Sequence, residues 1–331
     1  MSKNGNGNKG TWLTYRPEIK VLDCTIRDGG LMNNHRFDDS VVRGVYETCV
    51  SAGIDYMELG YKNSKEQFPT EKFGPWKHCD EADMRRIVGD NDTDLKLSAM
   101  ADAEKCDYRE DILPADESVL DMIRVATYIH QLPVAIDMIN DAHEKGYETG
   151  ANIMAVSTVS ESELDEALGL LAETPATAIY LVDSFGSFYS EEVQRLVKKY
   201  RAVAKECGKE VGIHAHNNQQ LAYANTIEAI VNGVNFLDAT IGGLGRGAGN
   251  CPLELLIGFL KNPRYRLRPI LECIENHIAP LHASMEWGFD LPYMLTGLMN
   301  QHPRAAIGHL TKPKAERQSI VDFYDAMMAD I

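Results

Sequence analysis

Basic side chains are scarce in this chain compared with acidic ones. Its 331 residues include 33 Lys and Arg against 49 Asp and Glu, a net charge of −16. A surface field of that sign disfavours binding to nucleic acid or an anionic membrane, so we expect neither as a partner. No apolar run is long enough to span a bilayer, and the polar residues 1–10 lack the apolar stretch of a secretory signal.

The seven cysteines are too widely spread to form a recognisable site. No two have CxxC spacing, and an odd count does not suit a disulfide scaffold. Unpaired thiols are typical of a reducing compartment, and we therefore expect a cytoplasmic protein. With 44% hydrophobic and 25% charged residues, the composition is that of a folded globular protein rather than a disordered or fibrous one.

Short apolar runs alternate with longer amphipathic segments along most of the chain. Strands are predicted at residues 19–25, 54–59, 95–100, 121–126, 151–156, 178–182, 211–214 and 236–239. Helices are predicted at residues 39–52, 81–88, 133–145, 161–172, 190–206, 218–232 and 252–260. Eight such units in about 240 residues indicate an α/β fold, the (β/α)8 TIM barrel. The alternative, a doubly wound open sheet, expects a glycine fingerprint after its first strand, where this chain has Arg27 and Asp28.

We divide the chain into three parts on this pattern. Residues 1–18 form a flexible N-terminal tail, residues 19–262 the catalytic barrel, and residues 263–331 a C-terminal helical extension. Apolar periodicity predicts helices near residues 270–281 and 293–299. The extension either caps the barrel or builds an oligomer interface.

Polar residues stand where the strands are predicted to end, which is the catalytic side of a TIM barrel. His214 and His216 are two residues apart on a predicted strand, so their imidazoles project to one face. Asp28, at the end of the first strand, can add a carboxylate oxygen. Three such ligands with open positions suit Mn²⁺, Mg²⁺, Fe²⁺ or Zn²⁺ and a chelating substrate. An HxH pair alone is weak support, since both histidines can be ordinary polar residues.

Four further polar residues surround this predicted centre. Arg27 can hold an oxygen of a 2-oxo acid and stabilise an enolate, or form a surface salt bridge. Glu58 can orient Arg27. Ser184 can donate to a substrate carboxylate or cap the following helix. Asn250, after a glycine-rich loop, can reach the metal, cap the last helix, or do both.

These motifs together resemble those of the DRE-TIM metallolyase superfamily, the HMG-CoA lyase-like barrels. Asp23-Cys24-Thr25-Ile26-Arg27-Asp28-Gly29 resembles its strand-one signature, and Asp183-Ser184-Phe185-Gly186, His214-Ala215-His216 and the loop at 243–250 are similar to its later motifs. The loop sequence GLGRGAGN is most similar to the 4-hydroxy-2-oxovalerate aldolase-type pyruvate aldolases, of which this chain looks like a divergent branch.

The resemblance implies roles for individual residues. Asp28, His214 and His216 would be metal ligands, with Asn250 as a further candidate ligand, and His214 would also contact the substrate. Arg27 would bind the pyruvate oxygen, with Glu58 as its catalytic partner, and Ser184 the substrate carboxylate. Tyr293 would close over the substrate. Apart from the resemblance, our hypothesis is that Arg246 and the insertion at residues 61–76 select the aldehyde half.

The chain also departs from the aldolase branch. Leu31 stands where that branch has its base histidine, so His35 is our candidate for the base that removes the 4-hydroxyl proton. The extension is short for the domain that docks a dehydrogenase, so we expect no obligate dehydrogenase partner. Self-association through such a tail is usual in the family, and a homodimer is expected.

The predicted function is that of a divalent-metal-dependent carbon–carbon lyase or aldolase. It would cleave or form a 4-hydroxy-2-oxo acid through a metal-bound pyruvate-type enolate, with Mn²⁺ or Mg²⁺ expected before Zn²⁺, Co²⁺ or Fe²⁺. The alternatives are a Claisen-type acyl-CoA condensing synthase, similar to the isopropylmalate and homocitrate synthases, and a non-catalytic metal-binding barrel.

Overall fold

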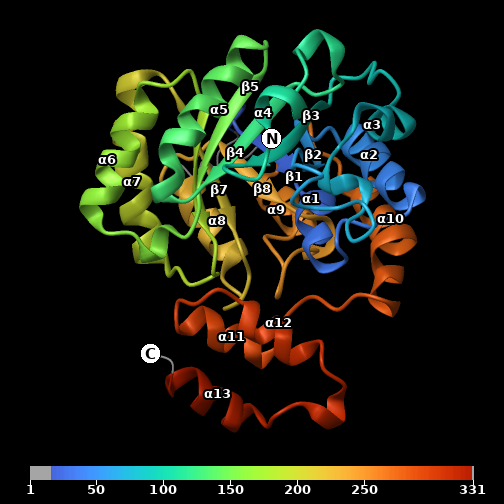
Figure 1. Cartoon of the computed structure of the whole chain (residues 1–331), viewed down its shortest axis with the longest axis vertical. Helices are drawn as coiled ribbons and strands as arrows, with labels where there is room; N and C mark the ends of the chain where they lie inside the picture. The colour runs from blue at the N-terminus through green and yellow to red at the C-terminus, as the bar shows by residue number, and fades with distance from the viewer. Residues whose placement is uncertain (1–15, 330–331) are drawn as a thin grey trace, which may run out of the picture.

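The computed structural model describes residues 16–329, and within them eight parallel strands close into a barrel (Figure 1). Each strand pairs with the next along the chain, and the eighth pairs with the first. The strands are β1 (Lys20–Asp23), β2 (Tyr56–Tyr61), β3 (Lys96–Asp102), β4 (Met122–Thr127), β5 (Glu148–Ile153), β6 (Ala178–Asp183), β7 (Glu210–Ala215) and β8 (Phe236–Ala239). The predicted (β/α)8 barrel is confirmed, while the first fifteen residues of the predicted tail lie outside the described residues.

Helices follow the strands, and most of them cover the outside of the barrel, whereas the short helix after β1 lies at the barrel end (Figure 1). They are α1 (Thr25–Gly29), α2 (Asp39–Ala52), α3 (Glu81–Val88), α4 (Tyr108–Asp111), α5 (Leu132–Glu144), α6 (Glu161–Ala172), α7 (Ser190–Cys207), α8 (Ala222–Val231) and α9 (Leu253–Leu260). The predicted bounds of α2 and α3 agree with the structure. Gly53 ends α2 with a φ of 74°, and a Cβ there would lie 2.7 Å from the Arg264 carbonyl oxygen, so only glycine fits.

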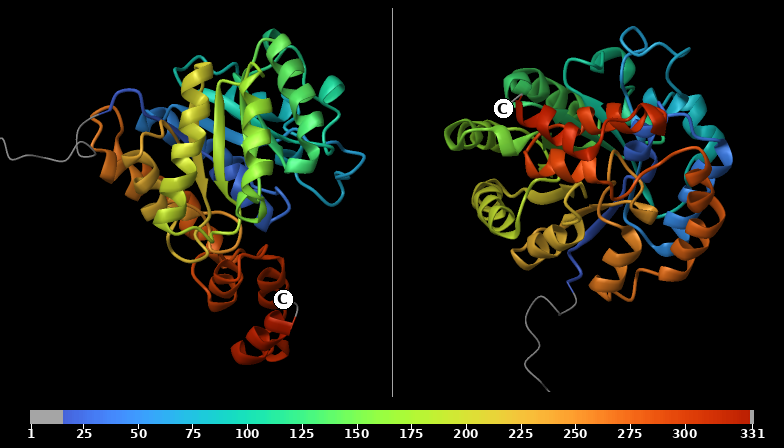
Figure 2. Two further views of the ribbon diagram at one scale, coloured as in Figure 1. Left: turned by 90° about the vertical axis from the view of Figure 1, so that its left-hand side faces the viewer. Right: turned by 90° about the horizontal axis from the view of Figure 1, so that it is seen from below.

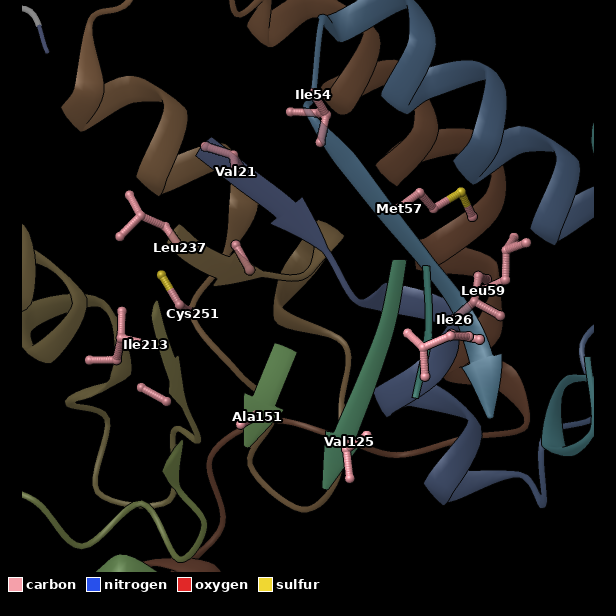
Figure 3. Close-up of a cluster of buried hydrophobic side chains, with 14 of the residues drawn as sticks. Val21, Ile26, Ile54, Met57, Leu59, Val125, Ala151, Ile213, Leu237 and Cys251 are labelled. Carbon is pink, nitrogen blue, oxygen red and sulfur yellow. The ribbon is translucent and has the colours of Figure 1, made fainter. Parts of the chain in front are cut away.

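Alternate side chains of each strand pack into two separate hydrophobic cores. In β1, Val21 belongs to the large cluster between the strands and the outer helices, part of which Figure 3 shows. Its neighbour Leu22 belongs to a smaller cluster that also contains Tyr56, Tyr180 and Phe236. Because successive side chains of a strand point to opposite faces, this second cluster fills the barrel interior.

Strand one ends earlier than predicted, and this changes where two site residues lie. The chain turns after Asp23 because its carboxylate accepts hydrogen bonds from the backbone nitrogen (3.2 Å) and Oγ1 (2.5 Å) of Thr25. Residues 25–29 then form α1, so Arg27 and Asp28 lie on a short helix rather than at a strand end. Thr25 Oγ1 also accepts from the backbone nitrogen of Ile241 (2.8 Å), which ties α1 to the loop after β8.

Two other predicted boundaries also differ. The fifth strand begins at Glu148 and ends at Ile153, three residues before the predicted range. The predicted helix at 270–281 is divided into α10 (Leu267–Cys273), the π-helical turn η8 (Ile274–Ile278) and the 3-10 turn η9 (Ala279–Ala283), because Pro280 has no backbone N–H to continue a helix. Since α10 and η8 pack against α2, this part of the predicted extension joins the outer layer of the barrel.

The rest of the extension forms a lobe at one end of the barrel. It consists of α11 (Leu291–Leu298), α12 (Arg304–Leu310) and α13 (Ile320–Ala329), drawn in red across the barrel end in Figure 2. Its own small core is built from Tyr293, Leu295, Ala306, Phe323 and Met327. Among the helices in the described range, none is both long and apolar enough to traverse a bilayer.

Asp23 generates a prediction about stability and pH. Burial raises the pKa of this carboxyl group to about 7, so the folded protein keeps a proton that the unfolded chain loses near pH 4. The stability contributed by that proton is present at low pH and is lost as the pH rises towards 7. Asp23→Asn cannot ionise, and we expect it to reduce the fall in the free energy of unfolding between pH 5 and 7.5 by up to about 2 kcal/mol.

Urea denaturation of both proteins across that pH range measures this difference. Burial also raises the pKa of Asp183 to about 7. Because Asp183 is present in both proteins, its contribution to the pH dependence cancels in the comparison. Parallel stability curves for the two proteins would contradict the assignment to Asp23.

Candidate active site

A cavity of about 60 Å³ lies at the end of the barrel next to the extension. Its wall includes Arg27 and Asp28 from α1, Ser184 after β6, and His214 and His216 at the end of β7. These residues come from separate strand–helix units, yet they meet because the carboxyl ends of parallel strands share one end of a barrel. The structure therefore brings most of the predicted site residues to one place.

Asp28, His214 and His216 form a compact group of possible metal ligands. Asp28 Oδ2 lies 3.6 Å from His216 Nε2 and 4.0 Å from His214 Nε2, and one ligand atom from each residue lies within 4.8 Å of the others. All three side chains are buried, and His214 Nε2 has no hydrogen-bond partner. A buried nitrogen without a partner beside a carboxylate is the arrangement that a divalent cation would satisfy.

The other ring nitrogen of each histidine is held by an oxygen acceptor. His214 Nδ1 lies 3.0 Å from Asp238 Oδ2, and His216 Nδ1 lies 3.0 Å from the carbonyl oxygen of Asp183. These contacts favour the tautomer with the proton on Nδ1, which leaves the Nε2 lone pairs directed towards Asp28. The donor set thus fits a bound divalent cation in both geometry and protonation.

Asn250 lies beside Asp28 in the same arrangement. Its Nδ2 donates to Asp28 Oδ2, while its Oδ1 is buried without a partner. Gly245 makes this approach possible, since a Cβ there would lie 2.7 Å from Asn250 Nδ2 and 2.8 Å from Asp28 Oδ2. The glycine loop therefore closes directly over the Asp28 carboxylate.

A second group of possible ligands, Cys24, His214 and Asp238, shares a histidine with the first. It offers no independent site, because the Asp238 carboxylate is already engaged by His214 Nδ1 and by Arg124 Nη2 at 2.5 Å. Burial also raises the pKa of Cys24 well above its usual value, which opposes the thiolate that a metal would need.

Buried ion pairs link the predicted centre to the barrel interior. Arg27 donates through Nε to Glu58 Oε2 (2.6 Å) and through Nη1 to Asp28 Oδ1 (2.8 Å). Arg124 on β4 lies 3.2 Å from the same Glu58 oxygen and connects it to Asp238, while its guanidinium stacks 4.1 Å from the Tyr180 ring. Glu58, Arg27, Arg124 and Asp238 thereby join Asp28 to His214 through fixed contacts.

This network sets the charge state of the centre. Burial alone would raise the pKa of Asp28, but Arg27, the neighbouring histidines and Arg246 hold it well below its usual value. Burial likewise opposes the charge on Arg27, yet Glu58 and Asp28 raise the pKa of its guanidinium above the usual value. Asp28 is therefore a carboxylate and Arg27 a cation at any physiological pH.

The remaining predicted residues occupy different places. Ser184 lines the cavity, where its Oγ accepts from the backbone nitrogen of Ala155 (2.8 Å), and Arg246 lines it as well. His35 is buried with its ring 5.2 Å from that of Tyr61 and does not line the cavity. Tyr293 lines a separate cavity of about 610 Å³ between the barrel and the extension.

Comparisons with known proteins identify the family of this chain. The HMGL-like family model matches residues 18–269. The chain belongs to the HMGL-like family. It is thus a metal-dependent lyase, and the resemblance drawn from its motifs is confirmed.

Two curated relatives of this HMGL-like enzyme carry different names. It is 33% identical over 253 residues to an oxaloacetate decarboxylase of Mycobacterium tuberculosis, covering 75% of this chain and 71% of the relative. It is 28% identical over 272 residues to a 4-hydroxy-2-oxovalerate aldolase of Thermus thermophilus, covering 81% and 77%. These names support a lyase without deciding the substrate.

Solved structures show the same fold. The N-terminal domain of a candidate aldolase from Bacteroides vulgatus superposes with a TM-score of 0.77 at 28% identity, covering 95% of this chain and 100% of that one. The HMG-CoA lyase of Bacillus subtilis gives a TM-score of 0.63 at 18% identity, covering 79% and 93%. The second similarity supports the barrel architecture of the HMGL-like enzyme.

Two residues at the site of the HMGL-like enzyme, Arg124 and His302, were not singled out from the sequence, and Asp238 was noted only as a polar residue at the end of the eighth strand. Arg124 lies within the apolar run of β4, Asp238 within β8, and His302 between α11 and α12. The signal available for Arg124 was a lone guanidinium inside a predicted buried strand, which needs carboxylate partners. For His302 no local signal was available, because its position depends on how the extension folds over the barrel.

The contact between Asp238 and His214 generates a prediction about metal affinity. Asp238→Asn leaves a weaker acceptor for His214 Nδ1, so we expect divalent cation affinity to fall by about 10–100-fold. Isothermal titration with Mn²⁺ measures the change. Asp55→Asn is the matched control, since Asp55 is a buried carboxylate that instead holds Tyr265 and Arg264. Equal affinities for wild type and Asp238→Asn would contradict the orienting role.

Proposed function

We propose that this HMGL-like enzyme cleaves or forms a 4-hydroxy-2-oxo acid by way of a pyruvate-type enolate. The observation that supports this most is the placement of Arg27 beside the Asp28, His214 and His216 group. Its Nη2 is buried without a partner, while its Nε and Nη1 are fixed by Glu58 and Asp28. A guanidinium held in this way has one donor free for an oxyanion that develops next to the group.

In this proposal Asp28, His214 and His216 hold a divalent cation, with Asn250 Oδ1 as a further ligand. Mn²⁺ and Mg²⁺ are the first candidates, because the set mixes imidazole with oxygen ligands. When bound, such a cation acts as a Lewis acid towards the keto oxygen of the substrate.

The chain's own residues orient the substrate and stabilise its charge. Arg27 Nη2 donates to the enolate oxygen and needs no reorientation, because Glu58 already fixes the guanidinium plane. Ser184 Oγ accepts from Ala155, which leaves its hydroxyl proton free to donate to the substrate carboxylate. The largely apolar wall formed by Leu31, Met100 and Met154 excludes water from the reacting carbons.

Aldol cleavage also needs a base for the 4-hydroxyl proton. Burial, followed by the nearby Lys77, lowers the pKa of His35 well below its usual value, so its imidazole is neutral but is also a weaker base than a free histidine. His35 packs edge-on against the Tyr61 ring, and of these two residues only Tyr61 lines the cavity, while His35 Nδ1 is buried without a hydrogen-bond partner. We retain His35 as the proposed base, which the substrate hydroxyl would have to reach past Tyr61.

Decarboxylation of oxaloacetate is the second candidate, and Leu31 is the observation that favours it. An apolar side chain lines the cavity at the position where the aldolase branch has its base histidine. Loss of CO₂ from oxaloacetate yields the same enolate without removing a hydroxyl proton, so it needs no such base.

The assignment of the metal ligands predicts the behaviour of one histidine variant. His216→Ala removes a ligand nitrogen, so we expect Mn²⁺ affinity to fall at least about 100-fold and turnover to below about 1% of wild type. Pyruvate release from 4-hydroxy-2-oxovalerate and from oxaloacetate, coupled to lactate dehydrogenase and corrected for spontaneous decarboxylation, measures turnover.

His282→Ala is the matched control for that experiment. His282 stacks on Trp287 in the larger cavity at 3.6 Å and has no role in the proposed chemistry. We expect this variant to keep wild-type metal affinity and turnover. Full activity of His216→Ala would show that the site is assigned wrongly.

A further inference from the structure

Arg246, from the glycine loop, is a cation that faces the cavity without a carboxylate partner. Its Nη2 donates to the Ser184 carbonyl oxygen (2.5 Å) and lies 3.4 Å from His216 Nε2, and its Nη1 lies 3.2 Å from His302 Nε2. Its Nε is buried with no partner. Among residues 16–329 no Asp or Glu forms a direct ion pair with this guanidinium, in contrast to Arg27 and Arg124, although Asp28 interacts with it at longer range.

The extension supplies the neighbour of this guanidinium. His302, which follows α11, lines the cavity and packs edge-on against the Phe185 ring at 5.9 Å. Burial, then Arg246, lowers the pKa of His302 to about 4, so it is neutral near pH 7. The extension thus contributes a polar group to the cavity without adding charge.

The charges around the cavity indicate how much negative charge a ligand beside Arg246 should carry. The guanidiniums of Arg27, Arg124 and Arg246 balance the carboxylates of Asp28, Glu58 and Asp238. A divalent cation held by Asp28 and the two histidines adds two positive charges to this balanced set. A monocarboxylic 2-oxo acid cancels one of them, whereas a dicarboxylic 2-oxo acid cancels both.

We propose that Arg246 and His302 form a subsite for a second carboxylate, so the substrate is a 4-hydroxy-2-oxo dicarboxylic acid. This inference rests on the proposed function, because the 2-oxo end of the molecule must be held at Arg27 and the Asp28 group. The partly buried guanidinium then pairs with the distal carboxylate, and His302 limits the length of the subsite from the extension side.

The ion pair also favours one of the two candidate reactions, which act on different diacids: oxaloacetate loses its distal carboxylate, which is β to the keto group, whereas a 4-hydroxy-2-oxo diacid undergoes aldol cleavage. A carboxylate paired with Arg246 is stabilised as an anion, which opposes its loss as CO₂. Aldol cleavage keeps that carboxylate. The C3–C4 bond breaks, its electron pair stays on C3 as the enolate, the hydroxyl proton goes to the base, and C4 leaves as an aldehyde that still carries the carboxylate. Protonation of C3 by water completes pyruvate, so the products are pyruvate and glyoxylate when C4 bears only the carboxylate.

Binding of unreactive analogues to the Mg²⁺-loaded protein tests the subsite directly. 2-Oxoglutarate has the distal carboxylate but no 4-hydroxyl group to cleave, and 2-oxopentanoate replaces that carboxylate with a methyl group. Isothermal titration should show 2-oxoglutarate binding at least about tenfold more tightly in wild type. In Arg246→Met the two affinities should become equal within about threefold, while Arg246→Lys should keep part of the preference because it retains the charge.

Controls separate the subsite from general electrostatics and from misfolding. Arg304→Met removes an exposed cation just after His302 and should leave the preference for 2-oxoglutarate unchanged. His302→Leu should reduce that preference about threefold or more. Thermal unfolding of each variant should match wild type. Analogue binding is compared at a Mg²⁺ concentration that saturates each variant, because Arg246 lies 3.4 Å from His216 Nε2 and its removal can change the metal affinity.

The outcomes distinguish this inference from the proposed function. Equal binding of the two analogues to wild type, or a preference that survives in Arg246→Met, overturns the subsite while leaving the lyase proposal intact. Binding of neither analogue, nor of pyruvate, overturns both. The subsite is supported if the enzyme cleaves 4-hydroxy-2-oxoglutarate at least tenfold faster than 4-hydroxy-2-oxovalerate. If CO₂ release from oxaloacetate is instead the fastest reaction, the assignment of aldol cleavage to a dicarboxylic substrate is overturned.

Discussion

The site depends on one oxygen atom, Oε2 of Glu58, which two buried guanidiniums share. Arg27 lies 2.6 Å from it and Arg124 lies 3.2 Å from it, and both arginines pair in turn with carboxylates at the site. Because all these side chains are buried, no member can lose its partner without leaving an unpaired charge in the barrel. Glu58 thereby positions two residues of the proposed metal site. It holds Asp28 through Arg27, and it holds His214 through Arg124 and Asp238.

The barrel supplies what such a network needs. Its interior below the site is filled by apolar and aromatic side chains, and the Tyr180 ring lies against the Arg124 guanidinium. In these surroundings ion pairs are weakly screened and their geometry is held by packing. The same rigidity leaves Arg27 Nη2 and His214 Nε2 without partners, and both are groups that the chemistry of a 2-oxo acid lyase would use.

Sequence reasoning located the parts of the site that follow from local pattern. His214 and His216 share a face because of strand periodicity, and Asp28 reaches them because consecutive units of a barrel end on the same side. The end of strand one was placed too late, because the apolar run hides the local turn that Thr25 makes by donating to the Asp23 carboxylate. The turn is also held by the bond from Ile241 to Thr25, residues 216 positions apart. Long-range contacts of this kind leave no trace in a local window of sequence.

The same reason explains the residues that were missed. An arginine inside an apolar strand shows that partners exist but not which carboxylates they are, so Arg124 could not be connected to Glu58 and Asp238. His302 reaches Arg246 only because the lobe of α11 to α13 lies across the barrel end (Figure 2). The domain pattern predicted a helical extension, but its contribution of a side chain to the cavity is a property of the folded chain.

The central claim is that this centre generates an enolate from a bound 2-oxo acid. The most direct measurement is exchange of the pyruvate methyl protons with deuterium, followed by NMR after quenching and removal of metal. We expect exchange with Mn²⁺- or Mg²⁺-loaded protein, and none with chelator-treated protein or with His216→Ala. Absence of exchange with every divalent metal would contradict it, because the enolate is the species that the Asp28 group and Arg27 are proposed to stabilise.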